Sequence, residues 1–109
     1  MSKNNNFGNT DLLLMGLLKD EDLYGYLITQ RLAEQSNHFF EMKEGTLYPL
    51  LHQLEEKGYL ESYKKIAESG KERKYYHLTQ NGRKYFETKV KNWNQYYSAV
   101  NGILGGCDG

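Results

Sequence analysis

The sequence predicts a mainly α fold of the α+β class, with three helices, a two-stranded hairpin and a long C-terminal helix. Three observations lead to this prediction. Leucines spaced three and four residues apart within 44–57 indicate an amphipathic helix that stops at Gly58. Polar and apolar residues alternate on both sides of a turn at 67–71, which is typical of two antiparallel strands. Apolar residues then recur at spacings of four and three from Phe86 to Leu104, which indicates a helix with a heptad seam.

The length and composition fit one small helical domain with an appended element. The chain has 109 residues, of which 39% are hydrophobic and 26% are charged. No stretch approaches the roughly 18 apolar residues of a membrane helix, and the N-terminus has no apolar signal segment. We therefore expect a cytoplasmic protein with no membrane partner. Cys107 is the only cysteine and no His/Cys cluster accompanies it, so we expect no internal disulfide, no metal and no cofactor.

The formal net charge is zero, but the charges are segregated along the chain. Residues 1–61 include five basic and ten acidic residues, a net −5, whereas residues 62–84 include seven basic and two acidic residues, a net +5. A local excess of positive charge over so short a segment is a candidate surface for nucleic-acid phosphates. A solvated hairpin with incidental lysines is the alternative.

The first two helices are predicted from apolar spacing and capping residues. Residues 1–9 are polar and rich in asparagine, and we expect them to form a flexible arm. Thr10 is a candidate N-cap of a first helix, whose apolar residues face nearly all directions and therefore belong to the core or to an interface. A second helix is predicted over 23–35 with Asp22 as its cap. Gly25 in its first turn indicates the close approach of a neighbouring backbone.

The helix predicted over 44–57 has one apolar face and one hydrogen-bonding face. Leu47, Leu51 and Leu54 form the face that must be buried. Pro49 is tolerated if it lies in the first turn, where its missing N–H is not needed. Such a helix suits insertion into the major groove of DNA, and a solvated amphipathic helix is the alternative. The opposite face has small, hydroxyl, amide and imidazole side chains: Gly45, Thr46, Tyr48, His52 and Gln53.

The basic segment is predicted to form the hairpin. Strands are expected over 59–66 and 73–79, with Tyr76 and Leu78 directed toward the core. Three helices followed by a two-stranded basic hairpin have the order of a winged helix-turn-helix. We therefore predict a DNA-binding domain over residues 1–79.

Residues 80–105 are predicted to form a dimerisation helix that is capped by Thr79. A helix of roughly 25 residues extends for about 37 Å, which is more than so small a domain covers by itself. Its apolar seam predicts a homodimer, and the alternative is that the seam folds back on the first helix of the same chain. The tail at 106–109 is expected to be disordered. The predicted dimer interface consists of Leu12, Met15, Phe86, Val90, Trp93, Tyr97, Val100 and Leu104.

Three motifs resemble those of a known family of regulators. Residues 45–49, with the leucines and the glycine that follow them, resemble the signature of the PadR family of transcriptional regulators. Residues 70–79 with Gly82 resemble that family's wing and its junction with the last helix. Residues 23–26 resemble the start of its second helix. The resemblance covers about residues 10–104, and the single C-terminal helix is similar to the compact branch of the family.

The resemblance implies a homodimeric winged-helix repressor, and two-fold symmetry implies a palindromic operator in double-stranded DNA. It implies DNA contacts from Thr46, from Tyr48 and from the wing. His52 and Gln53 occupy positions that are commonly basic in the family, so more of the phosphate binding is expected from the wing. The predicted DNA-binding residues are Lys43, Gly45, Thr46, Tyr48, His52, Gln53, Lys64, Lys65, Lys71, Arg73 and Lys74.

The resemblance also implies an effector site. Some compact relatives take planar aromatic compounds into a pore at the dimer interface, which is lined by a tryptophan of the final helix. Trp93 stands where that tryptophan would, and Tyr96 and Tyr97 beside it add stacking surfaces. The implied effector is a small aromatic molecule that relieves repression. A lone tryptophan on an apolar seam is more often ordinary packing, so both interpretations of Trp93 stay open.

Two other classes of function follow from other interpretations of the sequence. The same fold could serve as a protein–protein interaction module without DNA binding, which the salt dependence of DNA binding would reveal. An enzyme is not expected, because His38, His52 and His77 have no matching nucleophile or paired carboxylates at suitable spacing. We therefore predict no catalytic residues.

Overall fold

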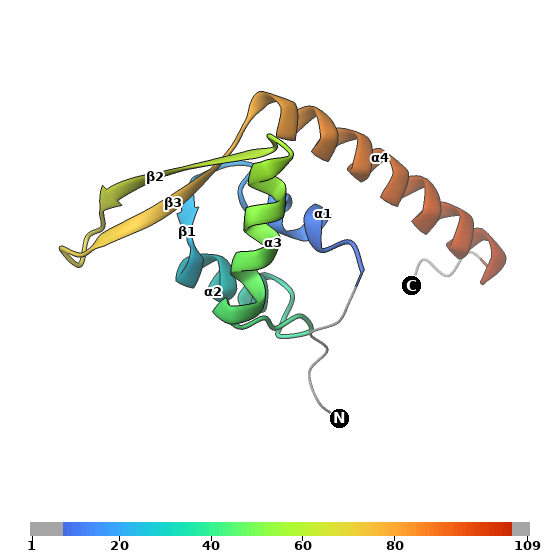
Figure 1. Cartoon of the computed structure of the whole chain (residues 1–109). Helices are drawn as coiled ribbons and strands as arrows, with labels where there is room; N and C mark the ends of the chain where they lie inside the picture. Colours follow the sequence, from blue (N-terminus) through green and yellow to red (C-terminus); the bar gives the residue numbers. More distant parts are fainter. Residues whose placement is uncertain (1–7, 106–109) are drawn as a thin grey trace.

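Four helices and three strands follow one another in the computed structural model, which describes residues 8–105 (Figure 1). The predicted arm at 1–9, apart from its last two residues, and the predicted tail at 106–109 lie outside the described residues. In chain order the elements are α1 (Thr10–Leu17), β1 (Leu23–Tyr24), α2 (Gly25–Gln35), α3 (Glu44–Glu56), β2 (Leu60–Ile66), β3 (Glu72–Leu78) and α4 (Gln80–Ile103).

The strands form an antiparallel sheet with the order β1-β3-β2, so β3 lies in the middle. β2 and β3 pair along their whole length, from Leu60 opposite Leu78 to Ile66 opposite Glu72. Together with the turn between them they are the predicted basic hairpin, which projects from the body as a long wing in Figure 1. Tyr76 and Leu78 of β3 are buried, as their alternation predicts.

The predicted second helix begins two residues later than expected, at Gly25. Leu23 and Tyr24 instead form β1, opposite Tyr76 and Tyr75 of β3. Two residues are too few to show a periodicity, and the hydrogen-bonding partner of this strand lies far along the chain. The third strand is therefore a product of tertiary contacts, which the local pattern did not contain.

The core lies where α1, α2 and α3 meet one face of the sheet. Leu47, Leu51 and Leu54 of α3 are at most 4% exposed, which confirms that their stripe faces inward. Because this stripe holds α3 against the body, only the opposite side of the helix is free to meet a partner. The other members of the core cluster are Leu14, Met15, Leu18, Leu23, Ile28, Leu32, Met42, Leu60, Tyr76 and Leu78.

The C-terminal end of α3 is closed as its glycine predicts. Gly58 has a φ of 81°, and the amide of Tyr59 donates to the carbonyl of Leu54 at 3.0 Å, which is the hydrogen-bond pattern of a helix closed by a left-handed residue. Pro49, however, lies in the second turn of α3 and not in the first. Because Pro49 has no N–H, the carbonyl of Gly45 lacks the hydrogen bond that the residue four positions later normally donates in a helix.

Capping by threonine is confirmed for α4 but is wrong for α1. Thr79 Oγ1 accepts a hydrogen bond from the amide of Gly82 at 3.0 Å. Thr10, in contrast, is already the first residue of α1, and Asn9 precedes it with a φ of 60°. Asparagine is among the few residues that tolerate this left-handed conformation, so the chain can turn sharply into the helix there.

The first half of α4 packs on α1, and its second half projects from the body in Figure 1. The Tyr85 hydroxyl donates to Asp11 at 2.8 Å, and the ring of Phe86 lies over Gly16, where an added Cβ would be 3.6 Å from it. The alternative in which the seam folds back on the first helix therefore describes the first half of α4 only. Within residues 8–105 no helix is long and apolar enough to cross a membrane.

Candidate nucleic-acid interface

The free side of α3 presents the predicted recognition residues. Because the leucine stripe is buried, the other side of the helix reaches the surface along its whole length. The predicted residues on and just before this helix are all exposed: Lys43, Gly45, Thr46, Tyr48, His52 and Gln53.

The helix itself supplies no positive charge. α3 contains Glu44, Glu55 and Glu56 but no lysine or arginine. His52 Nε2 lies 3.3 Å from Glu56 Oε2, one turn further along the exposed side. The exposed side of α3 can therefore make hydrogen bonds to base edges, but the cations that bind phosphate must come from another element.

Tyr48 is the largest polar side chain on the free side of α3. It is 42% exposed, and the hydroxyl end of its ring lies against Gly25 at the start of α2. Partial burial, together with the nearby charge of Glu44, raises the pKa of Tyr48 above its ordinary value of 10.0. The hydroxyl therefore stays protonated at neutral pH and can donate a hydrogen bond to a phosphate oxygen.

One face of the wing is directed toward α3. Ser62 of β2 donates a hydrogen bond to Glu55 of α3 at 2.6 Å, and it lies opposite the buried Tyr76 of β3. The next pair outward on the same face is Lys64 opposite Lys74, and both lysines are exposed. Like charges directly opposite each other destabilise a sheet, so this pair favours an anionic partner between or beside the two ammonium groups.

The other face of the wing also holds its cations over tyrosines, as the face toward α3 does where the Lys74 ammonium lies 5.6 Å from the ring centre of Tyr76. Lys65 lies opposite Arg73. The Lys65 ammonium is 4.9 Å from the ring centre of Tyr75, and the Arg73 guanidinium is 5.1 Å from the ring centre of Tyr24. Nε of Arg73 is buried and has no hydrogen-bond partner among the described residues. Arg73 and Lys74, which the sequence pattern groups in one site, therefore point to opposite faces of the hairpin.

Asp22 holds the wing face that bears Tyr63 and Tyr75 against the body. It does not cap α2, contrary to the prediction. Its carboxylate accepts a hydrogen bond from the Tyr63 hydroxyl at 2.6 Å and lies 2.9 Å from Nδ1 of His77. The hydrogen bond to Asp22, with some desolvation, raises the pKa of Tyr63 to about 12. Partial burial alone would raise the pKa of Asp22, but the contacts from Tyr63 and His77 outweigh it and lower that pKa. No local signal predicts this cluster, because its members come from three separate segments.

The tip of the wing adds one more predicted cation. Lys71 is exposed in the turn between β2 and β3, where its carbonyl accepts a hydrogen bond from the amide of Ala67 at 2.8 Å. Gly70 beside it has a φ of 89°, a conformation that lets the chain reverse. The wing thus has basic side chains on both faces and at its end.

Trp93 lies where the body and the projecting half of α4 meet. Its side chain is 44% exposed, and its ring centre is 6.0 Å from that of Tyr96 and 6.4 Å from that of Tyr97. It borders hollows of about 480, 550 and 210 Å³. The 480 Å³ hollow is a mainly apolar groove between α4, α1 and the end of α2, lined by Leu12, Leu13, Gly16, Leu17, Leu32, Gln35, Ser36, Phe40, Phe86, Val90 and Trp93.

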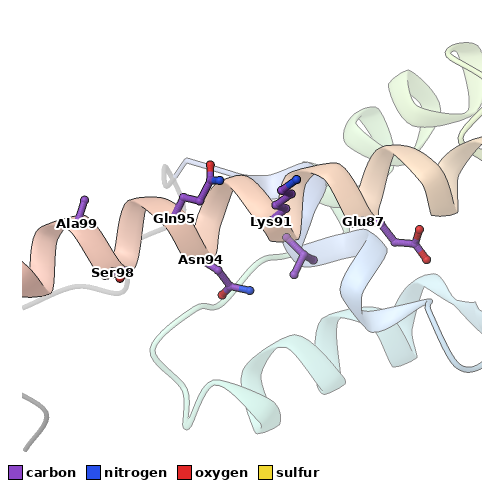
Figure 2. A pocket seen from close by; sticks show the side chains of 7 residues that line it. Glu87, Lys91, Asn94, Gln95, Ser98 and Ala99 are labelled. Atoms are coloured by element: carbon purple, nitrogen blue, oxygen red, sulfur yellow. The ribbon is translucent and has the colours of Figure 1, made fainter.

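A further hollow, of about 680 Å³, follows another side of α4 and has a different character. It has no aromatic lining residue, and all of its lining comes from one helix, so it offers a planar molecule nothing to stack on. Figure 2 shows the labelled lining residues Glu87, Lys91, Asn94, Gln95, Ser98 and Ala99.

The residues predicted at a dimer interface do not all reach the surface. Met15 is 0% exposed inside the core, so its assignment to the interface is wrong. The helix that bears it is apolar nearly all round, and its sequence could not tell the inner side from the outer one. Leu12, Phe86, Val90 and Val100 are half-buried. The remaining three residues are exposed: Trp93, Tyr97 and Leu104.

The histidines lie apart from one another and beside single carboxylates. His38 is 3.3 Å from Glu41, and His77 is 2.9 Å from Asp22. Within residues 8–105 no group of three or more histidine, cysteine, aspartate or glutamate side chains could hold a metal ion.

Comparison with known proteins finds similarity over most of the chain. The model of the transcriptional regulator PadR-like family matches residues 14–88. An uncharacterised protein of Lysinibacillus sphaericus is 33% identical over 101 residues, which are 93% of this chain and 93% of that protein. The crystal structure of a PadR family transcription regulator from Clostridium difficile is 35% identical with a TM-score of 0.79, and the match covers 90% of this chain and 100% of that one.

A DNA complex is among the similar structures. Bacillus subtilis PadR in complex with operator DNA matches with a TM-score of 0.67 and 28% identity, over 76% of this chain and 47% of that chain. The same organism's negative transcriptional regulator PadR is 33% identical over 70 residues, which are 64% of this chain and 38% of that protein. The chain thus spans less than half the length of that regulator.

Proposed function

The chain belongs to the PadR-like family of transcriptional regulators, and from this premise we propose that it is a homodimeric repressor that binds a palindromic operator. Its fold is the winged helix-turn-helix of that family, and it is a DNA-binding regulator and not an enzyme. The proposed DNA-binding domain is residues 1–79, and the proposed dimerisation helix is residues 80–105.

The observation that carries the proposal is that the wing's paired lysines and the free side of α3 share one face of the molecule. The hydrogen bond from Ser62 to Glu55 joins the two elements, and Lys64 and Lys74 lie one pair further out on the same face. In the proposed complex the free side of α3 enters the major groove, while the wing lysines neutralise flanking phosphates. This division of roles matches the distribution of charge, because α3 has no lysine or arginine that could bind a phosphate.

The proposed occupant of the exposed half of α4 is the same helix of a second copy. Tyr96, Tyr97, Ile103 and Leu104 are between 57% and 85% exposed on a helix that extends beyond its own domain. Large apolar side chains gathered on one projecting helix are typical of an interface. The groove beside Val90 and Trp93 continues this apolar surface onto the body, so the second copy could cover both. Two-fold symmetry would then set the half-sites about one helical turn, roughly 34 Å, apart.

The proposed effector is a planar aromatic molecule that binds beside Trp93 and relieves repression. Trp93 with Tyr96 and Tyr97 supplies three partly exposed rings within a single helical turn of one another, and stacking on such rings suits a flat ligand. A molecule bound between two copies of α4 would change the angle between them and thereby the spacing of the two α3 helices.

The experiment is selection of a binding site from a pool of random duplexes, followed by fluorescence anisotropy at several salt concentrations. The expected result is an inverted repeat whose affinity falls with a log–log slope of about −4, because two wing lysines from each protomer release counterions. A sequence-independent, salt-insensitive interaction would overturn the proposal and favour a protein-interaction module.

A further inference from the structure

Gly25 and Tyr48 form a contact that leaves no room for a side chain. Gly25 is the buried first residue of α2, and Tyr48 comes from the second turn of α3. A Cβ added to Gly25 would lie 2.2 Å from Oη of Tyr48, 2.6 Å from Cζ and 3.0 Å from Cε1. Real Cβ atoms essentially never approach other heavy atoms that closely, so any larger residue at Gly25 would displace the ring.

The backbone of Gly25 does not need glycine. Among the described glycines only Gly58, Gly70 and Gly105 have positive φ, so Gly25 has a conformation that any residue can adopt. Glycine in a helix is less favourable than alanine because it loses more conformational freedom on folding. The absence of a side chain at Gly25 is therefore explained by the space that Tyr48 occupies.

The position of Gly25 is itself fixed by the sheet. Tyr24, the residue before it, pairs with Tyr75 in β3, and β3 continues outward to the cations of the wing. The Tyr48 ring thus rests on the residue that follows Tyr24, and Tyr24 is paired with β3, one of the two strands of the wing. This contact therefore fixes the position of the start of α3 relative to the wing.

We propose that Gly25 is a positioning residue, which seats the Tyr48 ring so that its hydroxyl is held toward the DNA backbone. The inference rests on the proposed function, in which Tyr48 donates to a phosphate. Gly25 acts on DNA binding only through Tyr48 and has no contact with DNA of its own. A side chain at Gly25 would turn the ring away and remove the hydroxyl from its place, while α2 itself could still form.

The test is a double-mutant cycle of Gly25→Ala and Tyr48→Ala, with two measurements on each protein. Anisotropy with the duplex selected from the random pool gives DNA affinity, and thermal unfolding at one fixed protein concentration gives Tm. Each single substitution should weaken DNA binding by roughly tenfold, the worth of one charge-assisted hydrogen bond. The double variant should bind no more weakly than Tyr48→Ala alone.

The melting temperatures separate crowding from other roles of glycine. In the wild-type background Gly25→Ala should lower Tm, because the new methyl group collides with the ring. In the Tyr48→Ala background the same substitution should raise Tm by a few degrees, because alanine favours the helix. Gln30→Ala, at an exposed position on the same helix as Gly25, is the control and should change Tm equally in both backgrounds.

Each failure points to a different assumption. If Gly25→Ala lowers Tm equally in both backgrounds, crowding by Tyr48 is not the reason for glycine and the inference is overturned. If Gly25→Ala lowers Tm only beside Tyr48 but leaves DNA affinity unchanged, the pair is structural and its positioning role is overturned. If Tyr48→Ala itself leaves DNA affinity unchanged, the proposed contact of Tyr48 with DNA fails, although the Tm cycle still tests the packing.

Discussion

Lys64 on β2 lies directly opposite Lys74 on β3, on the face of the wing that also bears the Ser62–Glu55 hydrogen bond to α3. The neighbouring pair, Lys65 opposite Arg73, lies on the other face. Two lysines facing each other without an intervening anion repel, and the strand pairing is weaker for it. The wing therefore keeps an unfavourable pair on the side of α3, which is the side that the proposed DNA complex would use.

The two pairs of wing cations should differ in their effect on DNA binding. Changing Lys64 and Lys74 together to alanine is expected to weaken binding to all duplexes and to reduce the salt slope by about two per protomer, since each lysine accounts for about one phosphate. Changing Lys65 and Arg73 together should reduce the slope less, because their side chains lie on the face of the hairpin opposite to the Ser62–Glu55 contact with α3. Anisotropy titrations at several salt concentrations measure both.

The pair of Lys65 and Arg73 should also affect stability. Removing the Arg73 guanidinium from the Tyr24 ring should cost about 0.5–1 kcal/mol of unfolding free energy, the usual size of an exposed cation–π contact. Equal losses of salt slope for the two double variants would show that both faces of the wing lie on phosphates.

Tyr48→Phe separates the hydroxyl of this residue from its ring. The ring keeps its place over Gly25, and the hydroxyl rests against a residue that offers no side chain to bond, so Tm should barely change. DNA affinity should fall roughly tenfold, or by about 1.4 kcal/mol, the worth of one charge-assisted hydrogen bond. A large loss of stability with unchanged DNA binding would mean that the hydroxyl serves the fold.

Trp93 should report on ligand binding without any label. It is the only tryptophan and is 44% exposed, so a flat aromatic dye stacked on it should quench its fluorescence. Trp93→Ala should abolish dye binding, and sedimentation should show that the dimer remains, because Tyr97, Ile103 and Leu104 still offer apolar surface. Dissociation of the dimer by Trp93→Ala would identify the residue as interface packing.

Asp11 should make the attachment of α4 sensitive to acid. Partial burial alone would raise the pKa of this carboxyl, but hydrogen bonds from the Tyr85 hydroxyl and the Leu12 amide, with the charge of Lys89, lower it below 3.8. A carboxyl with a lowered pKa stabilises the fold above its unfolded pKa, and this contribution disappears as pH falls through the folded value. The stability from Asp11 is therefore present at pH 7 and is lost below about pH 4.

Asp11→Asn tests this dependence. The variant should be less stable at pH 7 by about 1 kcal/mol, and the difference from wild type should shrink as the pH is lowered from about 5 to 2. Thermal unfolding across that range measures it. Asp20→Asn changes an exposed carboxylate outside the cluster and serves as the control. A constant difference at every pH would show that the ionisation of Asp11 does not stabilise the contact with α4.

The sequence by itself determined the elements whose cause is local. The leucine spacing of α3 decided which side of that helix is buried, and the stop at Gly58 decided where it ends, because both depend on residues within a few positions. The alternation of β3 likewise identified Tyr76 and Leu78 as core residues. The excess of lysine and arginine over residues 62–84 located the basic wing, because charge is a property of the residues themselves, although Arg83 and Lys84 of that segment belong to α4.

Tertiary contacts decided what covers each face and which residues meet. Leu23 and Tyr24 are a strand only because β3 lies beside them, and Asp22 turns to Tyr63 and His77 instead of capping α2. Local periodicity records which side of an element is apolar, but the same apolar side can be covered by the chain's own core or by another molecule.

Two apolar surfaces show this difference. Met15 proved to be buried in the core of its own chain, whereas the far half of α4 projects beyond the body. The seam on that helix has a similar pattern along its whole length, yet Phe86 packs on α1 and Leu104 is 66% exposed. They differ in their distance from the body, because α1 has only 8 residues and is too short to cover the whole of a 24-residue helix.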